Sequence, residues 1–248
     1  MDQTIDETPE SFHSDMGKIG IYLSPKKLSE LKKFYITLKN KNADINLTSI
    51  IDWNSVLKRH FLDSATLALA IPELLENKFT NILDLGSGAG IPGIPLKIMF
   101  PNISITMLDS TAKKTDFIRH SIKTLNLIDA HVLEGRAEII GHELIHREHY
   151  DYVISRAVAP LPILLEYMIP LTTSKGKSIA MKGESVSQEI DNSQFALSEL
   201  NSFVDKKIQI SNYMNNHSGQ LLIIRKYGST NLKYPRRNGV PSKSPLVK

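Results

Sequence analysis

The central part of the chain alternates short apolar runs with longer amphipathic stretches. After residue 80, seven apolar runs follow one another, over residues 82–85, 103–108, 131–133, 152–154, 178–181, 208–210 and 221–224. Apolar strands separated by helical stretches are typical of a parallel sheet that helices cover on both faces. Too few residues separate the last two runs for a crossover helix, so we expect an antiparallel pair at the end of the sheet.

A helical segment is predicted on the amino-terminal side of these strands. Ser24 is placed to cap a helix, Pro25 fits its first turn, and apolar side chains recur every three or four residues up to Leu38. A second amphipathic segment runs from residue 55 to residue 71, before a proline. We therefore expect residues 21–78 to form a helical extension ahead of the sheet.

The two ends of the chain differ in composition from the body. Residues 1–20 contain several acids and no apolar core, so we expect an acidic, disordered tail and neither a signal peptide nor a membrane anchor. Residues 79–227 are expected to form the sheet domain, and residues 228–248 a basic, proline-rich tail. No stretch approaches the roughly 18 consecutive apolar residues of a membrane-spanning helix, so we expect a soluble, cytoplasmic protein.

Positive charge is concentrated at the carboxyl end. The formal net charge is +4, and residues 225–248 hold seven basic residues and no acid, so the rest of the chain carries +4 less seven, or −3. Three prolines and Gly239 disfavour regular structure in this segment. A basic arm of this kind suits a polyanion such as nucleic acid; a solvated, solubilising end is the alternative.

Cysteine and histidine usage bears on metal sites and nucleophiles. The chain contains no cysteine, which excludes disulfides, thiolate zinc sites and cysteine nucleophiles. The segment His142-Glu143-Leu144-Ile145-His146 matches the H-E-x-x-H signature, in which two imidazoles one helical turn apart bind zinc. It falls in a polar link between the third and fourth strands, where no buried helix is expected to hold it. We therefore predict an exposed loop and no metal site.

The most informative motif is an apolar strand that runs directly into a turn with glycine at positions 86, 88, 90 and 93. It reads Asn81-Ile-Leu-Asp-Leu-Gly-Ser-Gly-Ala-Gly-Ile-Pro-Gly93. Glycine lacks the Cβ that would hold a ligand away, and it tolerates positive φ, so the spacing predicts close approach of a ligand to the backbone. In open α/β sheets, ligands bind outside the carboxyl ends of the strands, where this turn lies.

Two acids at later strand ends narrow the choice of ligand. Asp109 ends the second strand, 23 residues after Gly86, where a carboxylate can bind both hydroxyls of a ribose. Glu138 follows the third strand, where an adenine edge would lie; its alternative role is to meet exposed amides at a helix start. The G-x-G-x-x-G fingerprint of dinucleotide enzymes fails at its sixth position, Ile91. The loop and the two acids instead resemble the S-adenosylmethionine site of methyltransferases.

Further motifs from about residue 20 onward resemble one family. They are Asn46-Leu-Thr-Ser49, Arg59-His-Phe-Leu-Asp-Ser64, Leu108-Asp-Ser110 with Lys113-Lys114, Arg136-Ala-Glu138, Ser155-Arg-Ala157, Lys182-Gly183 and the tail from Tyr234 to Leu246. Together with the glycine loop, they resemble the bacterial ribosomal RNA small subunit methyltransferase G family, also called glucose-inhibited division protein B.

The resemblance implies a fold, a cofactor and a reaction. The fold is α/β: a Rossmann-like, S-adenosylmethionine-dependent methyltransferase fold with a seven-stranded, mostly parallel sheet and an antiparallel last strand. The reaction is methylation of N7 of a guanine, guanine 527 of the family, in 16S ribosomal RNA. The partner is then 16S ribosomal RNA or a small ribosomal subunit particle, and we expect a monomer without membrane contact.

The resemblance also implies site residues. It places cofactor contacts on Gly86, Ile91, Ala137, Glu138 and Arg156, to which the loop and the ribose acid add Gly88, Gly90 and Asp109. Guanine N7 carries an in-plane lone pair, so the reaction needs alignment with the sulfonium methyl rather than a base. We assign no general base and give Arg156 a positioning role. Lys114 stands where the family pattern has arginine. Lysine keeps the positive charge but cannot make the bidentate phosphate contact that arginine makes.

Other functions stay open at this stage. A methyltransferase could act on another RNA site, on ribose or on a small molecule, although ribose methylation calls for a lysine–carboxylate relay that Lys182 alone does not supply. A nucleotide-binding oxidoreductase would need a glycine at the sixth loop position, and a non-enzymatic RNA-binding protein would not need a cofactor loop. We expect an RNA-facing mouth bordered by Arg59, His60, Lys113, Arg156 and Lys182.

Overall fold

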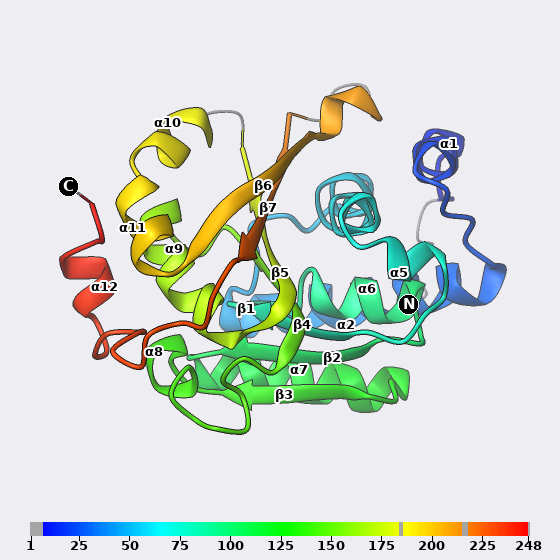
Figure 1. The fold of residues 1–248 in the computed structure, drawn as a ribbon. Coiled ribbons are helices and arrows are strands. Elements are labelled where there is room, and N and C mark those ends of the chain that lie inside the picture. The colour runs from blue at the N-terminus through cyan, green and yellow to red at the C-terminus, as the bar shows by residue number, and fades with distance from the viewer. Residues whose placement is uncertain (1–6, 184–185, 215–217, 248) are drawn as a thin grey trace.

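The computed structural model describes residues 7–183, 186–214 and 218–247. Its strands are β1 (Asn81–Leu85), β2 (Ser104–Asp109), β3 (Ala130–Glu134), β4 (Tyr150–Arg156), β5 (Thr172–Lys182), β6 (Ser202–Gln209) and β7 (Gln220–Lys226). They form one seven-stranded sheet in the order β3-β2-β1-β4-β5-β7-β6 (Figure 1). The strands from β1 to β5 pair in parallel, and β7 pairs antiparallel with both β5 and β6. The predicted α/β methyltransferase fold is confirmed.

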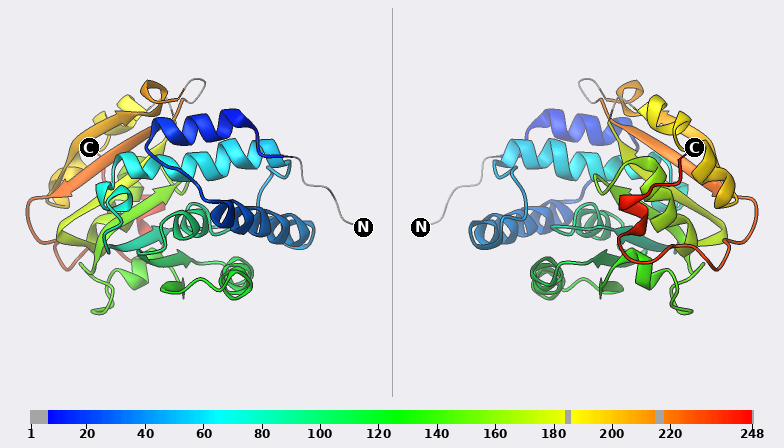
Figure 2. Two further views of the ribbon diagram at one scale, coloured as in Figure 1. Left: turned by 90° about the vertical axis from the view of Figure 1, so that its right-hand side faces the viewer. Right: turned by 90° about the vertical axis from the view of Figure 1, so that its left-hand side faces the viewer.

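Helices lie on both faces of the sheet (Figure 1, Figure 2). They are α1 (Glu10–Lys18), α2 (Pro25–Ile45), α3 (Trp53–Val56), α4 (Asp63–Ala65), α5 (Pro72–Leu75), α6 (Gly93–Met99), α7 (Ala112–Leu125), α8 (Ala137–Ile140), α9 (Leu161–Met168), α10 (Val186–Asp191), α11 (Gln194–Glu199) and α12 (Val240–Lys243). A π-helix, η1 (Leu57–Leu62), and the 3-10 helices η2 (Thr66–Leu69), η3 (Ile169–Leu171) and η4 (Ile210–Asn212) complete the set. Among the helices described, none has the length and apolar character needed to cross a membrane.

Side chains of the central strands alternate between two hydrophobic cores. In β7, Leu221 and Ile223 belong to one core, and Leu222 and Ile224 to the other. Helices α2, α6 and α7 cover the first core, and α9 and α11 cover the second. The two-sided burial explains the uniformly apolar runs of the sequence, because neither face of these strands meets solvent. The edge strand β6 begins six residues before its predicted start, because Lys206 and Lys207 interrupt its apolar pattern.

The amino-terminal helices share the first core with the sheet. The predicted cap of α2 is present, since the Ser24 side chain accepts a hydrogen bond from the Lys27 amide. The Phe34 ring of α2 lies 6.1 Å from the Phe61 ring and 6.4 Å from the Phe117 ring of α7, measured between centroids. The boundary expected at residue 78 therefore marks where the sheet begins, while the apolar core continues across it.

The periodicity of the second amphipathic segment suggests a single α-helix. The structure instead has a succession of short helices there: α3, η1, α4 and η2. Two side-chain hydroxyls bond to the backbone there: Ser64 donates to the His60 carbonyl and Thr66 to the Asp63 carbonyl. Hydroxyls that bond to the helix backbone compete with the regular i→i−4 pattern. Single π-helical turns occur frequently at functional sites, and η1 contains Arg59 and His60, two of the residues expected at the RNA-facing mouth.

The amino terminus differs from the disordered tail expected over residues 1–20. Helix α1 occupies Glu10–Lys18, and its Phe12 and Met16, one turn apart, are buried in the first core. Two apolar side chains on one helical face were too few to predict a helix among so many polar residues. Residues 1–6 of the expected tail lie outside the described part of the chain.

The carboxyl-terminal residues 228–247 also differ from the expected irregular arm. They pack on the second core, where Tyr234 and Leu246 are buried, and they contain the short helix α12. In Figure 2 this red segment lies across the molecule from the amino-terminal helices. The contacts that hold it are long-range hydrogen bonds and two ion pairs, which no local pattern of prolines and charges reveals.

The aromatic contact between α2 and α7 gives a test of the shared core. We expect Phe34→Ala to lower the free energy of unfolding by about 3–5 kcal/mol, because it opens a cavity among buried rings. Denaturant unfolding followed by circular dichroism should remain a single transition. Ile36→Ala, on the exposed side of the same helix, should change stability little. Separate transitions for the helical extension and the sheet would contradict a continuous core.

Candidate functional site

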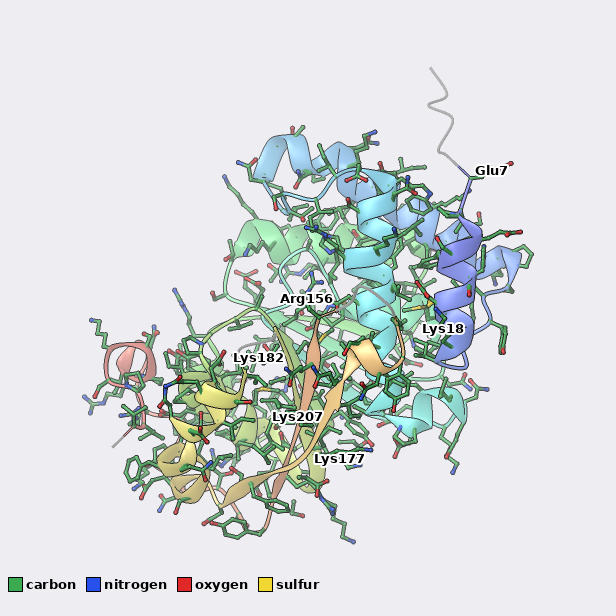
Figure 3. All side chains as sticks on the ribbon, turned by 90° about the horizontal axis from the view of Figure 1, so that it is seen from above. Glu7, Lys18, Arg156, Lys177, Lys182 and Lys207 are labelled. Carbon is green, nitrogen blue, oxygen red and sulfur yellow. The ribbon has the colours of Figure 1, made fainter. Side chains whose placement is uncertain are left out.

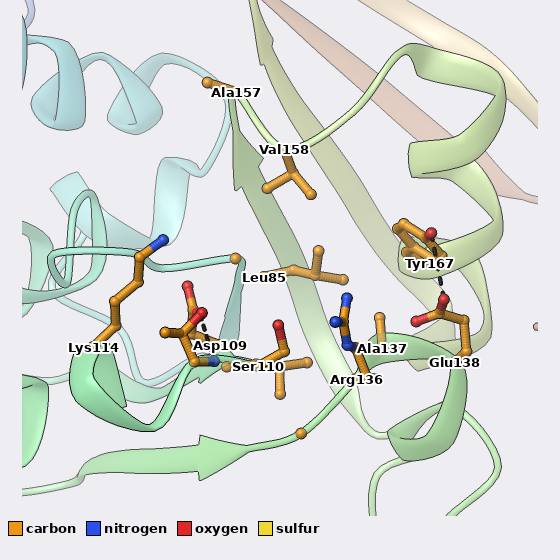
Figure 4. Close-up of a pocket in the computed structure, with 14 residues that line it drawn as sticks. Leu85, Asp109, Ser110, Lys114, Arg136, Ala137, Glu138, Ala157, Val158 and Tyr167 are labelled. Atoms are coloured by element: carbon orange, nitrogen blue, oxygen red, sulfur yellow. Dashed lines mark hydrogen bonds between the residues drawn. The ribbon is translucent and has the colours of Figure 1, made fainter. Parts of the chain in front are cut away.

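A cavity of about 310 Å³ opens at the carboxyl ends of the central strands (Figure 4). Its walls come from the segments after β1, β2, β3 and β4 and from α9. The lining residues are Leu85, Gly86, Leu108, Asp109, Ser110, Thr111, Lys114, Gly135, Arg136, Ala137, Glu138, Ala157, Val158 and Tyr167. This is the edge of an open α/β sheet at which ligands bind.

The first glycine of the turn, Gly86, lines this cavity. Gly86 has φ of +75°, which disfavours any side chain, and a Cβ built there would lie 2.3 Å from Cγ2 of Val158. Bare backbone is therefore required where the turn meets the wall of the cavity. Gly93 has a different role from the close approach expected of it: it lies in α6, and a Cβ there would meet Met107 at 2.7 Å. It serves the packing of α6 on β2.

Asp109 connects two of the walls. One carboxylate oxygen, Oδ2, accepts the amide of Gly88 at 2.9 Å, and the other, Oδ1, accepts the amide of Thr111 at 2.9 Å. The side chain lines the cavity although it is only 8% exposed. Because each carboxylate oxygen can accept more than one hydrogen bond, Asp109 can also bind a ligand hydroxyl.

Asp84 lies fully buried behind the glycine turn and is not part of the cavity lining. Its Oδ2 accepts the amide of Gly93 at 3.0 Å, which ties the end of β1 to the start of α6. Its Oδ1 has no hydrogen-bond partner among the described residues. Burial raises the pKa of this carboxyl to about 7, so the neutral acid predominates below neutral pH.

Glu138 and Tyr167 form the opposite wall. The Oε1 atom of Glu138 accepts a hydrogen bond from the Tyr167 hydroxyl at 3.5 Å, drawn in Figure 4, and one from the Gly239 amide at 3.0 Å. Burial, with the negative charge of Glu138, raises the pKa of Tyr167 to about 12, so the phenol keeps its proton and donates. Glu138 lies in the first turn of α8, as its alternative role required, but the amide that it binds comes from the carboxyl-terminal segment.

Arg156, at the end of β4 and labelled in Figure 3, does not line the cavity but bonds to the amino-terminal helical region. Its Nη1 donates to the Arg59 carbonyl and to Asp63, each at 2.9 Å. His60 lies beside it, and burial, together with the positive charge of Arg156, lowers the pKa of this histidine to about 4. A neutral His60 whose Nε2 lies 3.1 Å from the Thr48 hydroxyl is part of the packing rather than of a charged mouth.

The structure brings together some of the expected cofactor contacts. Gly86, Asp109, Ala137 and Glu138 line the cavity; Gly88, Gly90, Ile91 and Arg156 do not, so their contact with a cofactor stays a prediction. The sequence reasoning missed Ser110, Val158 and Tyr167. In the sequence, Ser110 and Val158 are marked only by following a strand, and Tyr167 only by lying in the helix after one. Neighbouring residues share these positions, so the sequence does not single out these three as cavity residues.

The residues expected at an RNA-facing mouth fall into two groups. Arg59 and Lys113 are exposed. Lys182 instead donates to the Ala159 carbonyl at 2.8 Å and pairs with Glu189 at 2.7 Å. The mouth that the structure presents is therefore smaller than the one expected.

The H-E-x-x-H segment lies in turns rather than in a helix. Its two imidazoles have different partners: Nε2 of His142 lies 2.7 Å from the Pro235 carbonyl, and Nδ1 of His146 lies 2.8 Å from the Tyr150 hydroxyl. Within the described ranges, no three histidine or acidic side chains are grouped closely enough to hold a metal ion.

The residues that line the cavity suit the chemistry of S-adenosylmethionine. Bare backbone at Gly86 gives room for close approach, and apolar side chains of Leu85 and Val158 can contact a purine ring. The acids Asp109 and Glu138, on opposite walls, can accept hydrogen bonds from ribose hydroxyls and from an exocyclic amine. Their negative charge also suits a cationic sulfonium ligand.

Comparison with known proteins identifies the family of the chain. The family model described as GidB, rRNA small subunit methyltransferase G, matches residues 27–218. Curated proteins named ribosomal RNA small subunit methyltransferase G are similar over most of their length. The one from Alkaliphilus metalliredigens is 38% identical, with 92% of this chain and 95% of that protein covered. The one from Halalkalibacterium halodurans is 38% identical, with 95% and 98% covered.

A solved structure, of a mutant of MtNAS, shares the fold alone. It matches with a TM-score of 0.51 at 13% identity and covers 78% of this chain and 73% of that one. The family model spans more than half of the sequence, and the relatives match at well above 30% identity over nearly their whole length. The chain belongs to the rRNA small subunit methyltransferase G family.

Proposed function

We propose that this protein transfers the methyl group of S-adenosylmethionine to N7 of a guanine in 16S ribosomal RNA, guanine 527 of the family. The observation that carries the proposal is the cavity lined by Gly86, Asp109 and Glu138 in a chain of this family. We further propose that it acts as a cytoplasmic monomer, on 16S ribosomal RNA or on small-subunit particles.

Each part of the cavity has a binding role in this reaction. The cofactor, when bound, supplies an electrophilic methyl group on a positively charged sulfur. Asp109 binds the ribose hydroxyls, Glu138 accepts a hydrogen bond from the adenine amine, and the bare backbone of Gly86 lets the ligand approach. The residues hold the methyl donor in one orientation, which is the main requirement when the acceptor atom already carries a lone pair. No side chain has to remove a proton.

RNA binding depends on cations near the open side of the site. Arg59 and Lys113 are exposed, and Lys114 lines the cavity itself. These side chains can bind phosphates without covering guanine N7, which must stay free to accept the methyl group. Arg156 acts from behind: its bonds to the Arg59 carbonyl and to Asp63 fix the position of η1 relative to the end of β4.

The decisive experiment maps the modified atom. Small-subunit particles that lack the modification are incubated with the protein and labelled S-adenosylmethionine, and the product nucleoside is identified by mass spectrometry. We expect 7-methylguanosine at one position of 16S ribosomal RNA. Methylation of a ribose would instead favour a lysine–carboxylate relay, yet Lys182 and its partner Glu189 both lie outside the cavity lining. Incorporation elsewhere, or into protein, would contradict the proposal.

Asp109→Ala tests the cofactor site directly. The substitution removes the proposed acceptor of the ribose hydroxyls and also releases the Gly88 amide. We therefore expect the dissociation constant for S-adenosylmethionine to rise at least about ten-fold. Isothermal titration calorimetry without RNA measures this constant. Asp191→Ala, at an exposed carboxylate of α10, is the matched control and should bind normally. Equal affinities would remove Asp109 from the site.

Arg156→Ala tests the link between β4 and η1. Asp63 would lose its ion pair with Arg156 at a site where both side chains are largely buried, 23% exposed for Arg156 and 17% for Asp63. We expect methyl transfer to ribosomal RNA to slow about ten-fold or more, because the RNA-facing segment is no longer held in position. Single-turnover rates give the comparison, with Arg119→Ala, which breaks an exposed ion pair on α7, as control. Unchanged transfer and unchanged cofactor affinity would exclude Arg156 from any role in the site.

A further inference from the structure

Residues 228–247, here called the carboxyl-terminal segment, are held by contacts spread over their length. The first anchor is the link between β3 and β4, which contains the H-E-x-x-H motif. Arg147 of this link donates to the backbone carbonyls of Thr230 at 2.9 Å and Tyr234 at 2.8 Å. His142 of the motif lies 2.7 Å from the Pro235 carbonyl. The motif that resembles a zinc site therefore forms part of a docking surface for the end of the chain.

The second anchor is an ion pair between Arg236 and Glu166 of α9. Nε of Arg236 donates to Oε1 of Glu166 at 2.9 Å, Nη2 donates to Oε2 at 2.7 Å, and the Arg236 amide donates to Oε1 at 2.7 Å. The Glu166 side chain is 0% exposed. A bidentate, charge-assisted pair of this kind fixes geometry strongly, because Glu166 would become a buried, unpaired carboxylate if Arg236 moved away.

The third contact reaches the cofactor cavity. The amide of Gly239 donates to Oε1 of Glu138 at 3.0 Å, and Gly239 has φ of +77°, a conformation that favours glycine. The other carboxylate oxygen of Glu138, Oε2, accepts no hydrogen bond from the residues that the structure describes, so it remains for a ligand. Tyr167, which also binds Oε1, directly follows Glu166 on α9. The last two contacts of the segment thus converge on the wall formed by Glu138 and Tyr167.

We propose that the carboxyl-terminal segment is a positioning element of the S-adenosylmethionine site. Its Gly239 amide holds one oxygen of Glu138, so that the other oxygen faces the adenine amine, and the Arg236–Glu166 pair holds the segment at that place. The proposal rests on the proposed function for the identity of the ligand. It assigns the segment a role that its basic composition does not suggest, since Arg236 and Lys233 are engaged by Glu166 and Glu199.

Gly239→Pro breaks the contact in two ways: proline has no amide hydrogen to donate to Glu138, and its φ, fixed at about −65°, cannot match the +77° of Gly239. We expect S-adenosylmethionine to bind at least about ten-fold more weakly, because a hydrogen bond to a charged group is lost together with the turn that presents it. Calorimetry without RNA measures the dissociation constant, and thermal unfolding confirms that the variant is folded. Arg237→Ala, an exposed cation of the same segment, is the control and should bind S-adenosylmethionine with wild-type affinity.

A second measurement uses the wild-type chain and so does not depend on the folding of any variant. Coupling between two sites is reciprocal, so a segment that supports cofactor binding must itself be stabilised by the cofactor. We expect saturating S-adenosylmethionine to slow amide hydrogen exchange of residues 236–241 several-fold. Unchanged exchange in these residues, or a folded Gly239→Pro variant with normal affinity, would overturn the proposal.

Two other outcomes separate this proposal from its alternatives. If the segment is an RNA-binding arm, Arg237→Ala and Gly239→Pro leave cofactor affinity unchanged, while Arg237→Ala weakens ribosomal RNA binding and flattens its dependence on salt; this overturns the positioning role. Wild-type protein that binds no S-adenosylmethionine contradicts the proposed function itself. If the wild-type protein binds S-adenosylmethionine and the Gly239→Pro variant binds it equally well, only the proposed role of the segment is contradicted.

Discussion

The site depends on the carboxylate of Asp109, which holds the loop after β1 and the turn after β2 together. Neighbouring parallel strands end only about 4.8 Å apart, so one side chain can bond to the amides of Gly88 and Thr111 on both sides. A carboxylate buried to this degree is stable because both of its oxygens are satisfied. The same bonds fix the walls of the cavity before any ligand arrives, so binding does not have to order the loop first. The absence of a side chain at Gly86 leaves space for a ligand, and the bonds of Asp109 hold the surrounding loops in place.

A second constraint lies on the other side of the same strand ends, where Arg156 joins β4 to the π-helix η1. The Arg59 carbonyl and the Asp63 carboxylate share its guanidinium, so the backbone that carries the exposed Arg59 side chain is fixed relative to the sheet. Burial keeps His60 neutral beside this pair, which avoids a second positive charge against Arg156. The amino-terminal helices, which share a core with α7 through Phe34, are thus connected to the cofactor side by packing and by an ion pair at once.

A structural feature can be predicted from the sequence when the residues that form it are close together along the chain. The existence and order of the strands, the Ser24 cap and the glycine turn follow from neighbours along the chain and are confirmed, although β5 and β6 each begin six residues before the predicted run. Asp109 was identified because strand ends of a parallel sheet meet at one edge. The partners of Arg156 lie more than 90 residues away, and the Gly239–Glu138 bond spans 101 residues; composition carries no information about such pairs. Helix α1 was missed for a different reason, since only two buried side chains, Phe12 and Met16, distinguish it.

The geometry of α9 explains how the end of the chain can influence the cofactor cavity without entering it. Consecutive residues of an α-helix point about 100° apart, so Glu166 and Tyr167 face different surroundings: Glu166 binds Arg236 of the carboxyl-terminal segment, and Tyr167 lines the cavity. Glu138 is bound from both directions, by Tyr167 and by Gly239. Loss of the Arg236–Glu166 pair would leave a buried carboxylate uncompensated one residue from the cavity wall. The positive charge of the carboxyl-terminal segment therefore does not by itself indicate a free RNA-binding arm. Arg236 neutralises the buried Glu166 and stabilises the fold, so it is no longer available to bind a phosphate.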